Sequence, residues 1–397
     1  MARRGDGAAP ALVWFRDDLR LADNPALHDA AHAGAPLVAL FGLEEIRGTP
    51  GRGAASLWWL HHSLRALASD LEARDVSLVL RRGDPADIVP EIASALGAAT
   101  VFWNRRYGPA GQRDAVLAEA LGRDGIAVRE SAANLLHDPD RLTTKGGGPY
   151  RVFTPFWRAL SATFPPRPPL PAPATLDAAT HALKSDRLDD WALLPSGPDW
   201  AGGLRETWEP GEAGAARRLE HFLDGKIDRY ADGRDRPDAE LTSGLSPHLH
   251  FGEISPIQIW HAVDRNGSVG NGGGNASKFL SEIGWRDFSY HLLEHKPDLG
   301  ATNFNAKFDS FPWVADDDAL AAWQRGLTGY PIVDAGMRQL WQCGWMHNRV
   351  RMITASFLIK DLMIDWRAGA AWFWDTLVDA DPANNSASWR PPEEAHP

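Results

Sequence analysis

The feature that most narrows the possible folds is a regular alternation of apolar runs and helix-like segments between residues 11 and 135. The runs are ALVWF, PLVALFGL, VSLVLR, ATVFWN and IAVRES. One segment between them places leucines at helical spacing, at Leu57, Leu60, Leu64, Leu67 and Leu71. Apolar strands that alternate with helices are typical of a parallel sheet covered on both faces. The sequence therefore predicts a doubly wound, five-stranded parallel α/β domain at residues 1–135.

This domain lacks the usual phosphate-binding signatures. The first apolar run leads into RDDLR (Arg16–Arg20), and neither GxGxxG nor GxxxxGK follows it. Dinucleotide binding at this sheet is therefore not supported. The glycines at 146–148 are interpreted as a hairpin or loop, because no strand and helix flank them.

The rest of the chain changes character twice. Residues 136–204 form an interdomain linker that contains PPRPPLPAP and few periodic segments. Residues 205–397 are predicted to form an all-α domain. The expected helices lie near residues 212–225, 255–264, 276–294, 317–325, 331–343, 346–363 and 368–378.

The segment from Thr328 to Trp366 is predicted to form two helices around Gly344. Pro331 suits a first helical turn, and glycine suits a C′ position with positive φ. No charged residue occurs between Met352 and Ile359, so we expect the second helix to pack inside a helical core. Asn348 and Met352 share one of its faces, which either packs against polar groups of another helix or lines a pocket.

Composition limits the partners. The net charge is −11, and residues 205–397 carry 19 Lys and Arg against 28 Asp and Glu. Any DNA contact must therefore come from a local basic patch. The single cysteine, Cys343, excludes an intramolecular disulfide, suits a reducing cytoplasm and is expected to be a buried, inert thiol. The sequence shows no signal peptide and no run of about 20 apolar residues.

Three stretches carry candidate chemistry. The turn before Pro247 is interpreted as an anion site or as a helix capped by Ser246. Glu282, Trp285 and Arg286 share a helix face, which suits recognition of an extruded pyrimidine pair; the alternative is a Glu282–Arg286 ion pair with a core tryptophan. Asp379 and Asp381 would be a weak cation site, and the HxH at His248 is a weak metal signal, so no metal is predicted.

The strings TGYPIVDAGMRQLWQCGWMHNRVRMITASFLIKDLMIDW, WFRDDLRLADNPAL and TSGLSPHLHFGEIS closely resemble the photolyase/cryptochrome family, most of all the class I photolyases of cyclobutane pyrimidine dimers. The resemblance implies an FAD cofactor in the helical domain. It also implies a possible antenna chromophore, methenyltetrahydrofolate or a deazaflavin, on the α/β domain. The residues implied to hold FAD are Tyr230, Thr242, Ser243, Gly244, Leu245, Ser246, Arg351, Asp379, Ala380, Asp381 and Asn385.

The same resemblance implies roles at the lesion. Arg351 would pair with Asp379, and Asn385 would face flavin N5, where a neutral amide suits a reduced flavin that a carboxylate would repel. The implied catalytic residues are Glu282, Asn348, Met352 and Asn385. The implied electron-transfer tryptophans are Trp313, Trp366 and Trp389. The implied DNA-binding residues are Arg234, Glu282, Trp285, Arg286, Asn348 and Arg349.

The activity implied is light-driven repair of cyclobutane pyrimidine dimers in single- or double-stranded DNA by electron transfer from reduced FAD, in a cytoplasmic monomer. The dimer would be flipped out of the stack before repair. After Trp389 the sequence ends in RPPEEAHP, where the family usually continues with a second tryptophan and further helices. Relative to the family the chain is therefore C-terminally short. A cryptochrome-like photoreceptor without repair and an inactive truncated remnant are the alternatives.

Overall fold

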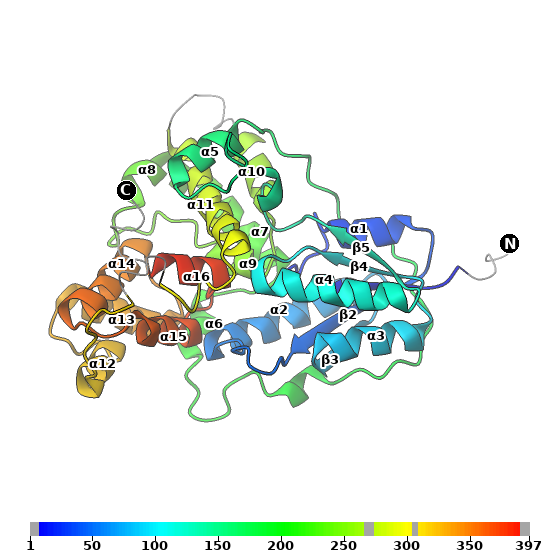
Figure 1. Ribbon diagram of the computed structural model, residues 1–397, viewed down its shortest axis with the longest axis horizontal. Coiled ribbons are helices and arrows are strands. Elements are labelled where there is room, and N and C mark those ends of the chain that lie inside the picture. The colour runs from blue at the N-terminus through cyan, green and yellow to red at the C-terminus, as the bar shows by residue number, and fades with distance from the viewer. Residues whose placement is uncertain (1–7, 266–273, 304–308, 390–397) are drawn as a thin grey trace.

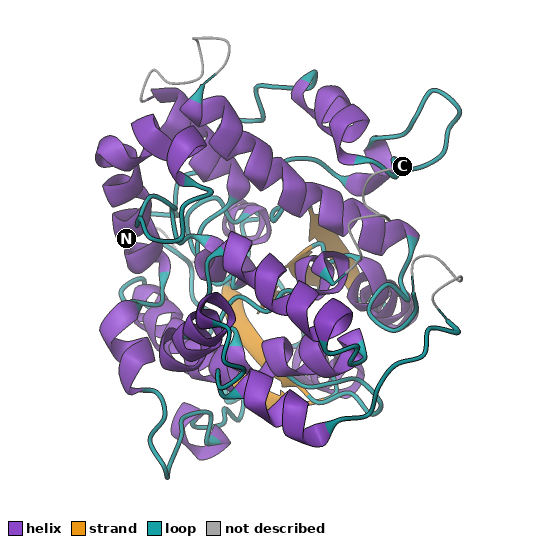
Figure 2. Cartoon of the chain, turned by 90° about the vertical axis from the view of Figure 1, so that its left-hand side faces the viewer, coloured by secondary structure: helices purple, strands orange, loops and turns teal. Residues whose placement is uncertain are grey.

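A computed structural model describes residues 8–265, 274–303 and 309–389. Most of the glycine-rich sequence NGSVGNGGGN (266–275) and the C-terminal sequence (390–397) lie outside the described residues. Figure 1 shows a sheet with its covering helices at one end and a wholly helical part at the other. Figure 2 shows the strands enclosed by helices. No helix in the described ranges is long and apolar enough to cross a membrane.

The N-terminal part is the predicted parallel sheet. Its five strands lie in the order β3-β2-β1-β4-β5, and every pairing is parallel. The strands are β1 (Ala11–Phe15), β2 (Leu37–Glu44), β3 (Leu78–Gly83), β4 (Thr100–Asn104) and β5 (Ala127–Ser131). The burial of β1 through all five residues explains its unbroken apolar run, because both faces of the sheet are covered.

Two pairs of helices cover the sheet. The core on one face contains residues of α1 (Pro25–His32) and α2 (Ala54–Glu72). The core on the other face contains residues of α3 (Pro85–Leu96) and α4 (Gly108–Arg123). The leucine stripe that predicted α2 is buried against the sheet from Leu60 to Leu71.

The linker is more ordered than predicted. It contains α5 (Phe153–Ser161), whose buried Phe156 packs on the helical part. Further on, the backbone of Leu37 donates to Asp177 and accepts from Ala179, so the linker just after the proline-rich run pairs with the start of β2. The glycine turn is a loop closed by Thr144, which bonds to Gly147 and Gly148, as expected.

The helical part contains two hydrophobic cores. One is built around α11 and the other around α13 to α15. The helices are α6 (Gly202–Thr207), α7 (Glu212–His221), α8 (Tyr230–Gly233), α9 (Ser246–His250), α10 (Pro256–Arg265), α11 (Asn275–His295), α12 (Asp317–Gln324), α13 (Pro331–Cys343), α14 (Asn348–Ser356), α15 (Trp366–Thr376) and α16 (Pro382–Ser388).

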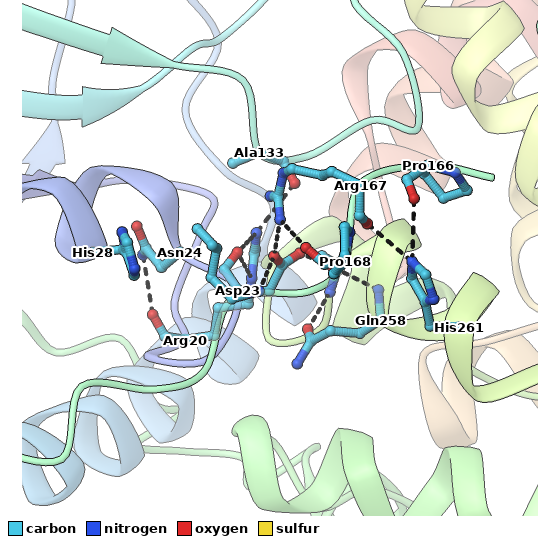
Figure 3. A network of polar contacts seen from close by, with 12 residues as sticks. Arg20, Asp23, Asn24, His28, Ala133, Pro166, Arg167, Pro168, Gln258 and His261 are labelled. Carbon is cyan, nitrogen blue, oxygen red and sulfur yellow. Dashed lines mark hydrogen bonds and ion pairs between the residues drawn. The ribbon is translucent and has the colours of Figure 1, made fainter. Parts of the chain in front are cut away.

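The two parts of the chain share a buried interface. Trp59 of α2 stacks on Phe251, with ring centroids 5.9 Å apart. Arg20 is fully buried and donates to the carbonyls of Asp23, Ala133 and Gly252. Figure 3 shows Arg20 and Asp23 in a network that continues through Arg167 of the linker. The α/β part is therefore bonded to the helical part at several points.

The predicted helix pair around Gly344 is confirmed, with one correction. Gly344 adopts φ +65° after α13, and His347 caps α14 through its ring nitrogen. After Ser356 the helix continues only as a π-helical turn, Phe357–Asp361. The expectation of a fully buried second helix is wrong, because the side chains of Met352 and Ile353 are 50% and 40% exposed. An uncharged run indicates an apolar face, but packing partners decide whether that face is covered.

Candidate functional site

Glu282 of α11 is paired with two basic side chains, Arg234 and Lys278. Its carboxylate accepts from Arg234 and lies 3.3 Å from the Lys278 ammonium. The alternative of a Glu282–Arg286 pair is wrong, since Arg286 donates to the carbonyls of Asn134 (2.5 Å) and Leu249 (3.3 Å). Glu282 is thus oriented by cations while part of its side chain stays accessible. A carboxylate held in this way can accept hydrogen bonds from a ligand.

Trp285 lies one helical turn further along α11. It is 37% exposed, so the alternative of a core tryptophan is wrong. One face of its indole stacks on Phe153, with centroids 3.8 Å apart and planes 11° apart. An exposed indole of this kind can stack on a nucleobase.

The α14 side contributes an amide and a thioether. Asn348 Nδ2 lies 4.0 Å from Met352 Sδ, and both side chains are exposed. Arg349 donates to Asp235 over 2.8 Å and approaches Met352 Sδ at 3.5 Å. The sequence left open whether the helix face with Asn348 and Met352 packs against another helix or lines a pocket. Because both side chains are exposed, the structure speaks against packing.

A chain of polar contacts joins α11 to α14. Arg234 bonds to Glu282, and its neighbour Asp235 bonds to Arg349. The two consecutive residues therefore connect helices whose candidate residues, Glu282 and Asn348, are more than 60 positions apart in the sequence. The structure brings Glu282, Arg234, Arg349, Met352 and Asn348 into one contact network.

The predicted Arg351–Asp379 pair is present. Arg351 Nη2 lies 2.8 Å from Asp379 Oδ2, and its guanidinium lies 5.9 Å from the Trp345 ring centroid. The second oxygen of Asp379, Oδ1, is buried and has no hydrogen-bond partner among the described residues. Buried acceptors are normally paired, so this atom fits a donor from a bound ligand such as a flavin ring N–H.

Asp381 is fully engaged within the chain. It caps α16 by accepting from the backbone of Asn384 at 2.7 Å, and its other oxygen accepts from the Tyr290 hydroxyl at 2.5 Å. Burial and this carboxylate raise the pKa of Tyr290 well above its usual value. Ala380 is buried beside it. No cluster of three or more metal-ligating side chains occurs in the described part of the chain.

Asn385 links the proposed flavin edge to the tryptophans. Its Oδ1 accepts from Trp389 Nε1 at 3.3 Å, and its Nδ2 approaches the Ala370 carbonyl at 3.4 Å. Trp389 and Trp366 are buried in one core, and Trp313 packs against it. The three predicted electron-transfer residues therefore share a single cluster.

The predicted phosphate-binding turn precedes α9. Gly244 has φ +62°, and a Cβ there would lie 2.6 Å from Arg218 Nη1. The capping alternative is wrong, because the N-cap of α9 is Leu245 and no side chain caps it. Ser246 is exposed, and its hydroxyl lies 3.3 Å from Trp345 Nε1.

The other residues predicted near the FAD phosphates, Thr242, Ser243 and Tyr230, differ in solvent exposure. Thr242 and Ser243 are half-buried beside the same turn. Tyr230 is only 7% exposed and packs edge-on against Phe279, so its ring serves the core as well. Cys343 is half-buried, so the prediction of a buried thiol is wrong, although partial burial still raises the pKa of its thiol.

A groove of about 660 Å³ lies elsewhere, and none of the candidate residues lines it. Its walls come from the linker at Pro169, from α7 and the turn after it, and from α10.

Sequence reasoning missed two residues. Asp235 bridges to a partner 114 positions away, which no local pattern indicates. Phe153 lies in the predicted interdomain linker (136–204), to which no site residue was assigned. Its stacking on Trp285 depends on how α5 docks on α11.

Comparison with protein families gives two matches. Residues 11–174 match the family model described as DNA photolyase, and residues 279–391 match the FAD binding domain of DNA photolyase. The chain is 53% identical over 383 residues to a deoxyribodipyrimidine photo-lyase of Agrobacterium fabrum. The aligned region covers 96% of this chain and 79% of the relative.

Solved structures agree with these matches. A bacterial class III photolyase from Agrobacterium tumefaciens superposes with a TM-score of 0.93 at 52% identity, covering 98% of this chain and 80% of that one. A Synechocystis sp. PCC6803 cryptochrome gives a TM-score of 0.86 at 28% identity, covering 98% and 83%. The α/β plus all-α architecture predicted from sequence is therefore confirmed, whereas the class I assignment stays a prediction.

Proposed function

This chain belongs to the photolyase/cryptochrome family, and we propose on that premise that it is a deoxyribodipyrimidine photo-lyase, a lyase that repairs cyclobutane pyrimidine dimers in DNA with light. The observation that supports this most is the contact network from Glu282 through Arg234, Asp235 and Arg349 to Asn348. Within this network an oriented carboxylate and an accessible amide lie at opposite ends of one series of side-chain contacts, which supports the proposal.

The side chains suggest a division of labour. Trp285 stacks on the flipped dimer, Glu282 accepts from base N–H groups, and Asn348 bonds to base carbonyls. Met352 supplies an apolar contact beside Asn348. A damaged pair costs less to unstack than an intact one, so flipping itself favours the lesion.

The residues present also fit FAD. Arg351 and the unpaired oxygen of Asp379 would hold the flavin edge, and the turn at 242–246 would hold the phosphates. Asn385 lies beside Trp389, which suits an electron route from the tryptophan cluster. Bound FAD supplies the photoexcited electron that splits the cyclobutane ring. An antenna chromophore on the α/β part, an action on single- or double-stranded DNA, a monomeric state and a cytoplasmic location stay predictions.

Not every implied DNA contact is free. Arg234 and Arg349 already bind carboxylates, and Arg286 binds two carbonyls. With the acidic net charge, DNA binding is expected to be weak for undamaged DNA and dominated by the dimer. The domain boundaries 1–135, 136–204 and 205–397 also stay a prediction.

The deciding experiment is repair in blue light. The purified protein, with its flavin reduced, should restore thymine in dimer-containing DNA under light and not in the dark. Asn348→Ala should reduce repair and dimer affinity about tenfold or more while the flavin content is retained. Gln339→Ala, an exposed amide on neighbouring α13, is the matched control. Joint loss of flavin and repair in Asn348→Ala would show a packing role instead.

The cryptochrome alternative is kept because of the likeness to the Synechocystis protein. It predicts flavin photoreduction without any dimer repair. The remnant alternative predicts purified protein without a flavin absorption band.

A further inference from the structure

We infer that Phe153, a residue of the interdomain segment, positions Trp285 for stacking on the lesion; this rests on the proposed function. Phe153 is the first residue of α5, and Trp285 lies on α11, 132 positions later. Their rings are 3.8 Å apart between centroids and 11° from parallel. Phe153 therefore covers one face of an indole that is still 37% exposed.

The supporting helix is itself firmly placed. Phe156 and Leu160 of α5 are buried, and Phe156 packs on Phe288 of α11 with centroids 5.2 Å apart. The backbone of Tyr150, just before α5, donates to His291 of α11 at 2.9 Å. These contacts fix where α5 presents its first residue.

A close approach between the two helices adds to this. A Cβ on Gly284 would overlap the Trp157 ring, so glycine is required where α5 crosses α11. The Trp157 ring also lies near Phe153, with ring centroids 6.2 Å apart and planes 13° from parallel. Phe153 is thus near-parallel to two tryptophan rings, Trp157 of its own helix and Trp285 of α11.

The stacking on Phe153 should hold the Trp285 side chain in one orientation before DNA binds. An exposed tryptophan can change rotamer, and binding a base would then require ordering it. A parallel aromatic neighbour restricts the indole to one orientation with one face turned away from the protein ring. A side chain held in advance binds its ligand more tightly than a mobile one.

The test measures dark affinity for DNA with a single thymine dimer and for undamaged DNA of the same sequence, at one salt concentration. Phe153→Leu, which keeps an apolar side chain but removes the flat ring, should weaken dimer binding about five- to tenfold. Binding to undamaged DNA, flavin content and melting temperature should change little. Phe153→Tyr should restore dimer binding. Phe164→Leu, a half-buried phenylalanine that also packs on Trp157, should not alter it.

A double-mutant cycle separates positioning from direct contact. Trp285→Ala should weaken dimer binding more than Phe153→Leu does, and the double variant should be no weaker than Trp285→Ala alone. Additive losses, or equal losses in Phe153→Leu and Phe164→Leu, would overturn the inference while the proposed function stands. A wild-type protein with no preference for dimer DNA would overturn both.

Discussion

At the scale of single residues, Asp379 shows how a buried acid can be placed for a ligand. One oxygen binds Arg351, and the other is buried without a partner in the described residues. Leaving a buried acceptor unpaired costs about 1–3 kcal/mol. The arrangement is therefore costly for the protein alone and becomes favourable when a donor binds.

Asp379→Asn should weaken FAD binding by about tenfold to a hundredfold, because a hydrogen bond to a charged acceptor contributes about 1.5–3 kcal/mol. The measurement is the flavin dissociation constant, from the recovery of flavin fluorescence on dilution. Asp365→Asn is the matched control, since that residue caps neighbouring α15 and asparagine caps equally well. Equal flavin affinity in the two variants would remove Asp379 from the cofactor site.

At the scale of secondary-structure elements, the end of α13 requires glycine at position 344 for two reasons, its positive φ and the lack of room for a Cβ. Gly344 has φ +65°, and a Cβ there would lie 2.8 Å from Val378 Cγ1. Gly97, at the end of α3, has φ +66°, and a Cβ there would have no neighbour within 4 Å. The two glycines differ only in crowding.

Gly97→Ala should lower the free energy of unfolding by about 1–2 kcal/mol, the cost of a left-handed alanine. Gly344→Ala should lower it by about 1–3 kcal/mol more, because Val378 must shift. Denaturant titration of both variants measures the difference. Equal losses would show that the contact with Val378 relaxes freely.

We expect the contact of α11 with the interdomain segment to depend on pH through Asp287. Asp287 accepts from the backbone of Leu136 at 2.8 Å and of His137 at 3.3 Å, and burial raises its pKa to about 7. In the unfolded chain this acid titrates near pH 4. Between these values the folded state holds the extra proton, so the free energy of unfolding falls as the pH rises, by up to about 1.4 kcal/mol per pH unit.

Asp287→Asn should abolish this part of the pH dependence, because the amide stays neutral and its oxygen can still accept from Leu136. The variant should match the wild type near pH 4 and exceed its stability at pH 8. Melting temperatures across this range provide the measurement. A wild type and variant with parallel curves would contradict a raised pKa for Asp287.

At the scale of the whole molecule, the α/β and helical parts are joined by buried polar groups as well as by aromatic stacking. Arg20 is 0% exposed and bonds to carbonyls from both parts. Glu212 of α7 accepts from the backbone of Leu21 and Ala22 in the α/β part. We therefore expect the two parts to unfold together.

Arg20→Met should destabilise the protein by about 3 kcal/mol or more, because three buried carbonyls lose their donor. It should also split the unfolding transition or broaden it. Arg205→Met, which removes an exposed pair with Asp199, should change stability by less than about 0.5 kcal/mol. Scanning calorimetry of both variants tests this. An unchanged single transition in Arg20→Met would show that the interface is held elsewhere.

Much of this molecule was determined by sequence alone. Apolar runs and helical spacing predicted the sheet and nearly every long helix, because these periodicities are local consequences of backbone geometry. Pro331 and Gly344 marked the ends of α13 for the same local reason. The string around Asn348 pointed to the family, and the Arg351–Asp379 pair followed from that resemblance.

Only the tertiary structure decided which partners each functional side chain has. Glu282 pairs with Arg234 instead of Arg286, Asp235 reaches Arg349, and Phe153 stacks on Trp285. It also left Met352 and Ile353 exposed where an uncharged run predicted burial. The physical reason is that such contacts join segments far apart in the chain, and their energy depends on how whole helices dock rather than on any local pattern.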